Sequence, residues 1–232
     1  MLSYVFAFIF GLLVPPVASR YPKVFASDWG EWLFFLWHKP KFPVTKDKKR
    51  TILLKQKWKK MCFFSLFWAF ILTALFVAID IYMPVSVRVW AKVFMCLMAL
   101  LSAVDQQYFL LPDIFTVPLL FLGFGYALWG GVITPTESFV GCCYGYFLPA
   151  VAVFVSSAFW RNAFGGGDVK MLAGLGAWVG MLPLCALLMI SVVSFFITAL
   201  ITKRRAGAYG PHLAFAGIIV LFLTVHHVIP FL

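Results

Sequence analysis

Two acidic residues lie at the edges of long apolar runs, where an acidic pair can perform acid–base chemistry. Asp105 lies within LLSAVDQQYFLLPD, and Asp168 lies within FGGGDVKMLAGLGAW. A charge beside hydrocarbon-length sequence is costly, so such residues usually face a protein interior or a water-filled cavity and carry function. Two neighbouring carboxylates share one proton, which is the arrangement that aspartic proteases use. We therefore expect Asp105 and Asp168 to form a hydrolytic pair if the fold brings them together.

The chemistry of such a pair needs neither a covalent intermediate nor a metal. The ionised carboxylate takes a proton from water, while the protonated one polarises the scissile carbonyl and later helps the amine to leave. The sequence contains no GxSxG, HExxH or Cys/His pair that would offer competing chemistry. Its five cysteines show no spacing typical of a metal site, so we expect no metal.

Asp168 also has a structural interpretation. It follows three glycines, Gly165, Gly166 and Gly167, and precedes an apolar run. Aspartate is a favoured residue at the start of a helix, and glycines before it form a turn. However, consecutive glycines also allow the backbone to approach a neighbouring helix or an extended peptide closely. Composition alone therefore leaves capping and catalysis open for Asp168.

Asp113 and Asp105 differ in how well a structural role explains them. Asp113 follows Pro112 and directly precedes the apolar run IFTVPLLFL, so we expect this pair to begin a helix that Asp113 caps. Asp105 instead ends an apolar run, where an acidic side chain meets the unfavourable end of a helix dipole. A position with that cost favours a functional role for Asp105.

The composition predicts a membrane protein of the all-α class. The chain has 232 residues, of which 63% are hydrophobic and 12% are charged, with a mean hydropathy of +0.98. Such a chain cannot bury its apolar surface inside one soluble core. Its apolar runs predict a polytopic bundle of about eight transmembrane helices: 2–17, 61–81, 87–104, 114–129, 139–160, 169–180, 184–201 and 213–228. The run 169–180 is short for a complete span.

Residues 20–60 form a strongly basic segment with twelve Lys and Arg against three acidic residues. A basic connection between two spans is typical of the cytoplasmic side, and tryptophans among lysines favour contact with anionic headgroups rather than nucleic acid. We therefore predict a first helix over 1–19, which Pro15 and Pro16 break or kink, then a cytoplasmic loop over 20–60 and a catalytic membrane domain over 61–232. This topology puts Asp105 and Asp168 on the same, cytoplasmic, side.

Four segments resemble those of one enzyme family in the expected order. GGGDVKMLAGLGAWVG, from Gly165 to Gly180, is similar to the GxGD segment of type IV prepilin peptidases. AVDQQYFLLPD, from Ala103 to Asp113, resembles the first catalytic segment of the family. GLLVPPVASRYP resembles its first helix, and AYGPHLAFAG, from Ala208 to Gly217, resembles its late glycine-proline segment.

The resemblance implies an integral aspartic endopeptidase of the bacterial inner membrane. Members remove the short basic leader of prepilins or pilin-like secretion proteins at the cytoplasmic face, cutting after a glycine. Asp105 and Asp168 match the two catalytic aspartates, and the active-site loop would include four neighbours of Asp168: Gly165, Gly166, Gly167 and Lys170. Proteolysis by the family needs no cofactor, whereas many members also methylate the new N-terminus with S-adenosylmethionine.

One departure from the family pattern concerns the basic segment. Many larger members carry two CxxC pairs there, typical of a zinc site, but residues 20–60 contain no cysteine, so we expect no zinc. The shorter segment leaves methylation open. Two other functions fit a small polytopic protein: an ion-coupled transporter, or a non-enzymatic assembly component of a secretion system. The positions of the aspartates at span ends, with no internal repeat, favour the peptidase.

Overall fold

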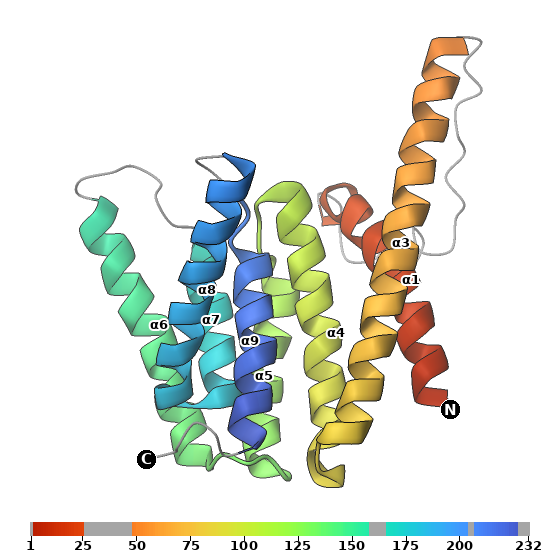
Figure 1. The fold of residues 1–232 in the computed structure, drawn as a ribbon. Helices are drawn as coiled ribbons and strands as arrows, with labels where there is room; N and C mark the ends of the chain where they lie inside the picture. Colours follow the sequence, from red (N-terminus) through yellow and green to blue (C-terminus); the bar gives the residue numbers. More distant parts are fainter. Residues whose placement is uncertain (1, 26–47, 158–165, 204–206, 227–232) are drawn as a thin grey trace. The chain divides into compact units, whose positions relative to one another are not determined.

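The computed structural model describes residues 2–25, 48–157, 166–203 and 207–226 (Figure 1), without the side chains of 20–25, 48–60, 153 and 155–157. These ranges are helical and contain no strand, which confirms the predicted all-α class. The described helices are α1 (Leu2–Phe25), α3 (Lys48–Tyr82), α4 (Val85–Tyr108), α5 (Asp113–Leu128), α6 (Pro135–Ser157), α7 (Gly166–Val179), α8 (Met181–Thr202) and α9 (Gly210–Val225). Each corresponds to one of the eight apolar runs.

Four of the described helices are long and apolar enough to cross a membrane. They are α1 over Leu2–Ser19, α3 over Met61–Tyr82, α4 and α8, whereas α5 and α9 are apolar but shorter. Large apolar side chains on the outside of these helices are exposed, among them Phe63, Phe196 and Ile201. Such surfaces are stable only against lipid. The chain is therefore a multi-pass membrane protein.

The chain divides into two compact units, Met1–Ala74 and Leu75–Leu232. In the first unit α1 continues through Pro15 and Pro16 to Phe25, so these prolines do not break the helix, and a kink there stays a prediction. Proline is tolerated in a membrane helix, and just after these prolines the Ser19 hydroxyl donates a hydrogen bond to the Pro16 carbonyl at 2.9 Å.

The predicted basic loop over 20–60 is helical at both ends. α1 extends to Phe25 and α3 begins at Lys48, while residues 26–47 lie outside the described residues. The proposed contact of this segment with headgroups, the absence of zinc from it, and the domain boundaries after residues 19 and 60 all stay predictions.

In the second unit the short helix α7 lies in the interior, in contact with α5, α6, α8 and α9 (Figure 1). Its 14 residues reach about 21 Å, less than the thickness of a bilayer core. Small residues let the neighbouring backbones come close, because a side chain at Gly176 would meet the backbone of Gly141 on α6. The fully buried Trp178 ends this packing and donates a hydrogen bond to the Leu119 carbonyl at 2.8 Å.

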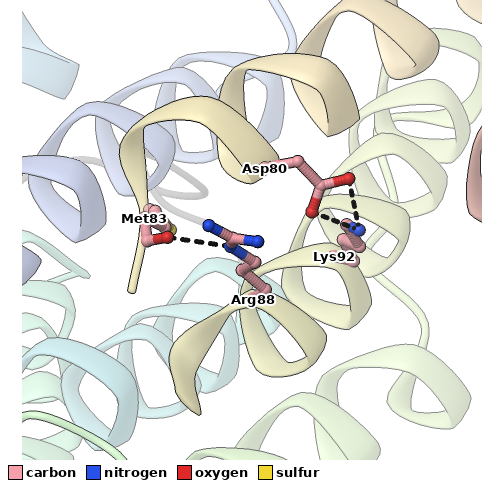
Figure 2. Close-up of polar contacts among 4 residues, drawn as sticks. All are labelled: Asp80, Met83, Arg88 and Lys92. Atoms are coloured by element: carbon pink, nitrogen blue, oxygen red, sulfur yellow. Dashed lines mark hydrogen bonds and ion pairs between the residues drawn. The ribbon is translucent and has the colours of Figure 1, made fainter. Parts of the chain in front are cut away.

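An ion pair joins the end of α3 to α4 within the second unit (Figure 2). The Lys92 ammonium lies 2.7 and 2.8 Å from the two carboxylate oxygens of Asp80, and 5.6 Å from the centroid of the Phe76 ring. Nearby, Arg88 Nε donates a hydrogen bond to the Met83 carbonyl at 2.9 Å. These contacts fix the beginning of α4, the helix that carries Asp105 in its last turn.

Candidate active site

Asp105 is buried at the end of α4, with only 5% of its surface exposed. Its Oδ2 accepts a hydrogen bond of 2.7 Å from the backbone N–H of Gly210, the first residue of α9. A helix N-terminus carries partial positive charge and unpaired N–H groups, so it stabilises a carboxylate. The start of α9 therefore compensates the unfavourable end of α4, which gives Asp105 a structural partner that its position in the sequence did not indicate.

The residue type at position 210 follows from this contact. A Cβ atom at Gly210 would lie 2.8 Å from Asp105 Oδ2 and 3.0 Å from both Cβ and Cγ of Asp105. These distances are shorter than van der Waals contact, so a larger residue would push the carboxylate away. Glycine therefore lets the α9 backbone reach the carboxylate directly.

Asp168 lies in the first turn of α7, after Gly166 and Gly167, and is half-buried. It therefore lies within the helix instead of at the capping position before it, which corrects the capping interpretation. Gly166, Gly167 and Lys170 likewise belong to α7, so they begin a helix instead of forming a loop, while their place at the active site stays a prediction; Gly165 lies outside the described residues.

The neighbouring glycines differ in their surroundings. A Cβ at Gly167 would lie 2.8 Å from Leu111 Cβ and 3.1 Å from the Leu111 carbonyl oxygen, whereas a Cβ at Gly166 would meet nothing within 4 Å. The expectation of a close backbone approach is thus met at Gly167. This contact packs the start of α7 against the connection between α4 and α5.

A second contact joins the same elements. The Lys170 ammonium lies 2.7 and 2.8 Å from the carboxylate oxygens of Asp113, at the first turn of α5. Pro112 precedes this helix in an extended conformation, and the helix start shows no side-chain capping bond. The prediction that Asp113 caps α5 is therefore wrong: its carboxylate faces a lysine of α7 instead. Both side chains are exposed, at 49% for Lys170 and 63% for Asp113.

Tyr209 relates the start of α9 to Asp168. Its hydroxyl lies 2.7 Å from Ser191 Oγ on α8. Burial raises the pKa of the Tyr209 phenol above its usual value, the hydrogen bond with Ser191 opposes this increase, and the negative charge of Asp168 adds to it. The charge of Asp168 therefore acts on Tyr209, and the next residue, Gly210, donates its hydrogen bond to Asp105. Both predicted aspartates thus interact with the start of α9.

Sequence reasoning did not assign roles to Tyr209, Gly210 or Ser191. The late glycine-proline segment was the available signal, since it contains Tyr209 and Gly210. Nothing in the spacing of Ser191 or in its residue type marks it as a neighbour of this segment.

A cavity of about 320 Å³ lies next to the same segment. Its lining comes from the end of α4, the second half of α8 and the start of α9: Gln106, Phe109, Phe195, Thr198, Ala199, Thr202, Gly207, Ala208, Pro211 and His212. None of these side chains carries a formal charge at neutral pH when His212 is neutral. The described residues contain no group of three or more His, Cys, Asp or Glu side chains that could hold a metal ion.

Comparison with known proteins finds a family similar to most of the second unit. Residues 92–202 match the model of the type IV leader peptidase family. This match covers a little under half of the chain, so this region is similar to that family. The leader peptidase region contains α4 from Lys92 onward and continues to the end of α8, so it includes Asp105, Asp113, Asp168 and Lys170.

Three relatives of the leader peptidase region are each named prepilin leader peptidase/N-methyltransferase. The protein from Neisseria gonorrhoeae is 34% identical over 123 residues, which are 50% of this chain and 41% of the relative. The protein from Aeromonas hydrophila is 35% identical over 135 residues, which are 52% of this chain and 44% of the relative. The protein from Dickeya chrysanthemi is 35% identical over 135 residues, which are 54% of this chain and 47% of the relative. The matches thus span a little under half of these relatives. No solved structure matches the chain significantly.

Proposed function

We propose that this chain is a membrane aspartic endopeptidase that removes the leader of prepilins or pilin-like secretion proteins, with Asp105 and Asp168 as its catalytic carboxylates. The observation that carries the proposal is the buried Asp105 carboxylate held by the N–H of Gly210 at the start of α9, next to Tyr209, on which the charge of Asp168 acts. Similarity to the leader peptidase family and the names of the relatives support the same activity.

The proposed mechanism uses the two carboxylates in complementary protonation states. The ionised one takes a proton from a water molecule, which attacks the scissile carbonyl, and the protonated one donates a hydrogen bond to the carbonyl oxygen. The proton taken from water then passes to the leaving amine as the tetrahedral intermediate collapses, which returns both carboxyl groups to their starting protonation states. The N–H of Gly210 holds the Asp105 carboxylate in one orientation throughout, so that carboxylate is already aligned when substrate binds.

The proposed location is the bacterial inner membrane, with the aspartates at its cytoplasmic face. The basic segment 20–60 supports this orientation through the positive-inside rule and would bind anionic headgroups. A prepilin with its apolar helix in the bilayer would then present its scissile bond near the inner interface, at the depth of Asp105 and Asp168.

Methylation of the new N-terminus is a second activity to be tested, because the relatives are named as N-methyltransferases. The methyl donor, S-adenosylmethionine, contains a ribose that proteins often hold with an acidic side chain. The cavity beside α9 has no acidic lining residue. A second cavity includes Glu137, but its carboxylate already accepts two hydrogen bonds from Thr134. These two cavities therefore give no support for binding of this cofactor, and the mechanism above includes no methyl transfer.

The test is co-expression with a prepilin substrate, followed by mass spectrometry of the substrate. Wild type should remove the leader, and Asp105→Asn and Asp168→Asn should each abolish removal. Asparagine can still accept the Gly210 hydrogen bond, so Asp105→Asn tests the acid–base role with little disturbance of α9. Normal processing by either variant would refute the assignment. The mass of the mature N-terminus reports methylation in the same experiment.

A further inference from the structure

One face of α8 carries polar and aromatic side chains that contact the start of α9. Ser191 Oγ lies 2.7 Å from the Tyr209 hydroxyl, and Ser194 Oγ lies 3.0 Å from His212 Nδ1. The Phe195 ring packs edge-on against the Tyr209 and His212 rings, with centroids 5.6 and 5.4 Å apart. Contacts with α8 therefore hold the chain on both sides of Gly210.

The Ser191–Tyr209 hydrogen bond lies in a buried setting. The fully buried Ser191 hydroxyl lies 2.8 Å from the Leu188 carbonyl and 2.7 Å from the Tyr209 hydroxyl, and either hydroxyl can donate in the bond that joins the two side chains. The raised pKa of Tyr209 keeps the phenol protonated at neutral pH. Tyr209 is thus joined to α8 by a hydrogen bond between two neutral hydroxyls.

Packing alone does not fix this part of α9. Gly207, Ala208, Pro211 and His212 line the cavity of about 320 Å³, so the segment has empty space on that side. A segment beside a cavity lacks the van der Waals contacts that would otherwise immobilise it on that side. The hydrogen bond of Tyr209, the residue directly before Gly210, therefore gains importance.

We propose that Tyr209 and Ser191 are positioning residues for Asp105: their hydrogen bond fixes the first turn of α9 so that the N–H of Gly210 orients the carboxylate. The inference rests on the proposed peptidase function, because its consequence is read as cleavage. It adds to that function an α8 residue, Ser191, that acts on Asp105 through Tyr209 and the backbone of α9.

The test compares Tyr209→Phe, Ser191→Ala and the double variant as purified full-length proteins in lipid vesicles. We measure kcat and KM for cleavage of a prepilin, together with the thermal unfolding midpoint. Each single variant should lower kcat about three- to tenfold, the kinetic equivalent of one hydrogen bond, with KM unchanged within about twofold. The double variant should be no slower than the slower single variant, because all three remove the same bond.

A matched control is Ser138→Ala. Ser138 is also fully buried, and its hydroxyl donates to the Ala177 carbonyl at 2.6 Å, between α6 and α7. This variant should lower the unfolding midpoint as much as Ser191→Ala does but leave kcat within about twofold of wild type.

Wild-type kcat in both Tyr209→Phe and Ser191→Ala, or an equal loss of kcat in Ser138→Ala, would overturn the positioning role alone. A change confined to KM would also overturn it, because the proposed effect is on the alignment of a catalytic group. Absence of cleavage by the wild-type protein would instead overturn the peptidase function, and this inference with it.

Discussion

Replacing Gly210 with alanine tests how closely the alignment of Asp105 depends on α9. The added Cβ would lie 2.8 Å from Asp105 Oδ2 and 3.0 Å from Cβ and Cγ. Ordinary contacts of this kind are at least 3.4 Å, so the carboxylate or the start of α9 must move by several tenths of an ångström. Asp105 is 5% exposed and α4 is fixed in the core, so this movement disturbs the hydrogen bond to Gly210.

Two opposing contributions set the change in the free energy of unfolding of Gly210→Ala. Alanine in place of glycine reduces the entropy of the unfolded chain and stabilises the fold by about 0.4–1 kcal/mol. Weakening a hydrogen bond to a charged group costs about 1.5–3 kcal/mol. The net loss in the free energy of unfolding should therefore be about 1–2 kcal/mol. Cleavage should fall more, by roughly tenfold or greater, because a small displacement of a catalytic group has a large kinetic effect.

The assay is steady-state cleavage of a prepilin by the full-length protein in vesicles, with the unfolding midpoint measured in parallel. Gly207→Ala is the matched control, because its added Cβ would lie 3.7 Å from Phe195 Cε2, an ordinary contact, in the same segment. We expect Gly207→Ala to cleave as wild type does. If Gly210→Ala cleaves at the wild-type rate, then the contact between α9 and Asp105 does not position the carboxylate, and the reasoning fails.

Three further changes test the packing that supports the site. Asp80→Asn or Lys92→Met alone should destabilise the protein by about 2–4 kcal/mol because each removes one partner of a partly buried ion pair. The double variant should recover part of this loss in thermal unfolding. A double variant that loses as much stability as the sum of the two single variants would contradict this. Lys170→Gln should change stability by less than about 1 kcal/mol, since its partner is solvent-exposed, and a larger loss in denaturation would refute that view. Gly176→Ala should destabilise by about 1–3 kcal/mol because the methyl meets the α6 backbone, and an unchanged midpoint would contradict the close approach.

The helices were predictable from the sequence because a membrane span depends on local composition. All eight apolar runs correspond to helices, and the short run 169–180 became the buried helix α7. Expectations drawn from neighbouring residues in the sequence failed where a residue far away in the chain supplies the contact. Pro15 and Pro16 interrupt the sequence pattern but not the helix, which continues to Phe25.

The partners of the predicted site residues could not be read from the sequence for the same reason. Asp105 looked isolated because its partner, Gly210, lies 105 residues later in the chain, and Asp113 looked like a cap because its partner, Lys170, lies 57 residues away. Residue type and spacing identify acidic positions at span ends, but the approach of α9 to α4 depends on the packing of the whole second unit. The resemblance supplied the aspartates and the late segment, whereas the contacts between them came from the structure.

The most direct test of the central claim is cleavage of a purified prepilin in vesicles by Asp105→Asn and Asp168→Asn, measured beside each variant's unfolding midpoint. The account predicts that both variants fold, with midpoints close to that of wild type, and that neither removes the leader. A folded variant of either aspartate that still cleaves at a rate near wild type would contradict the claim that Asp105 and Asp168 together hydrolyse the peptide bond.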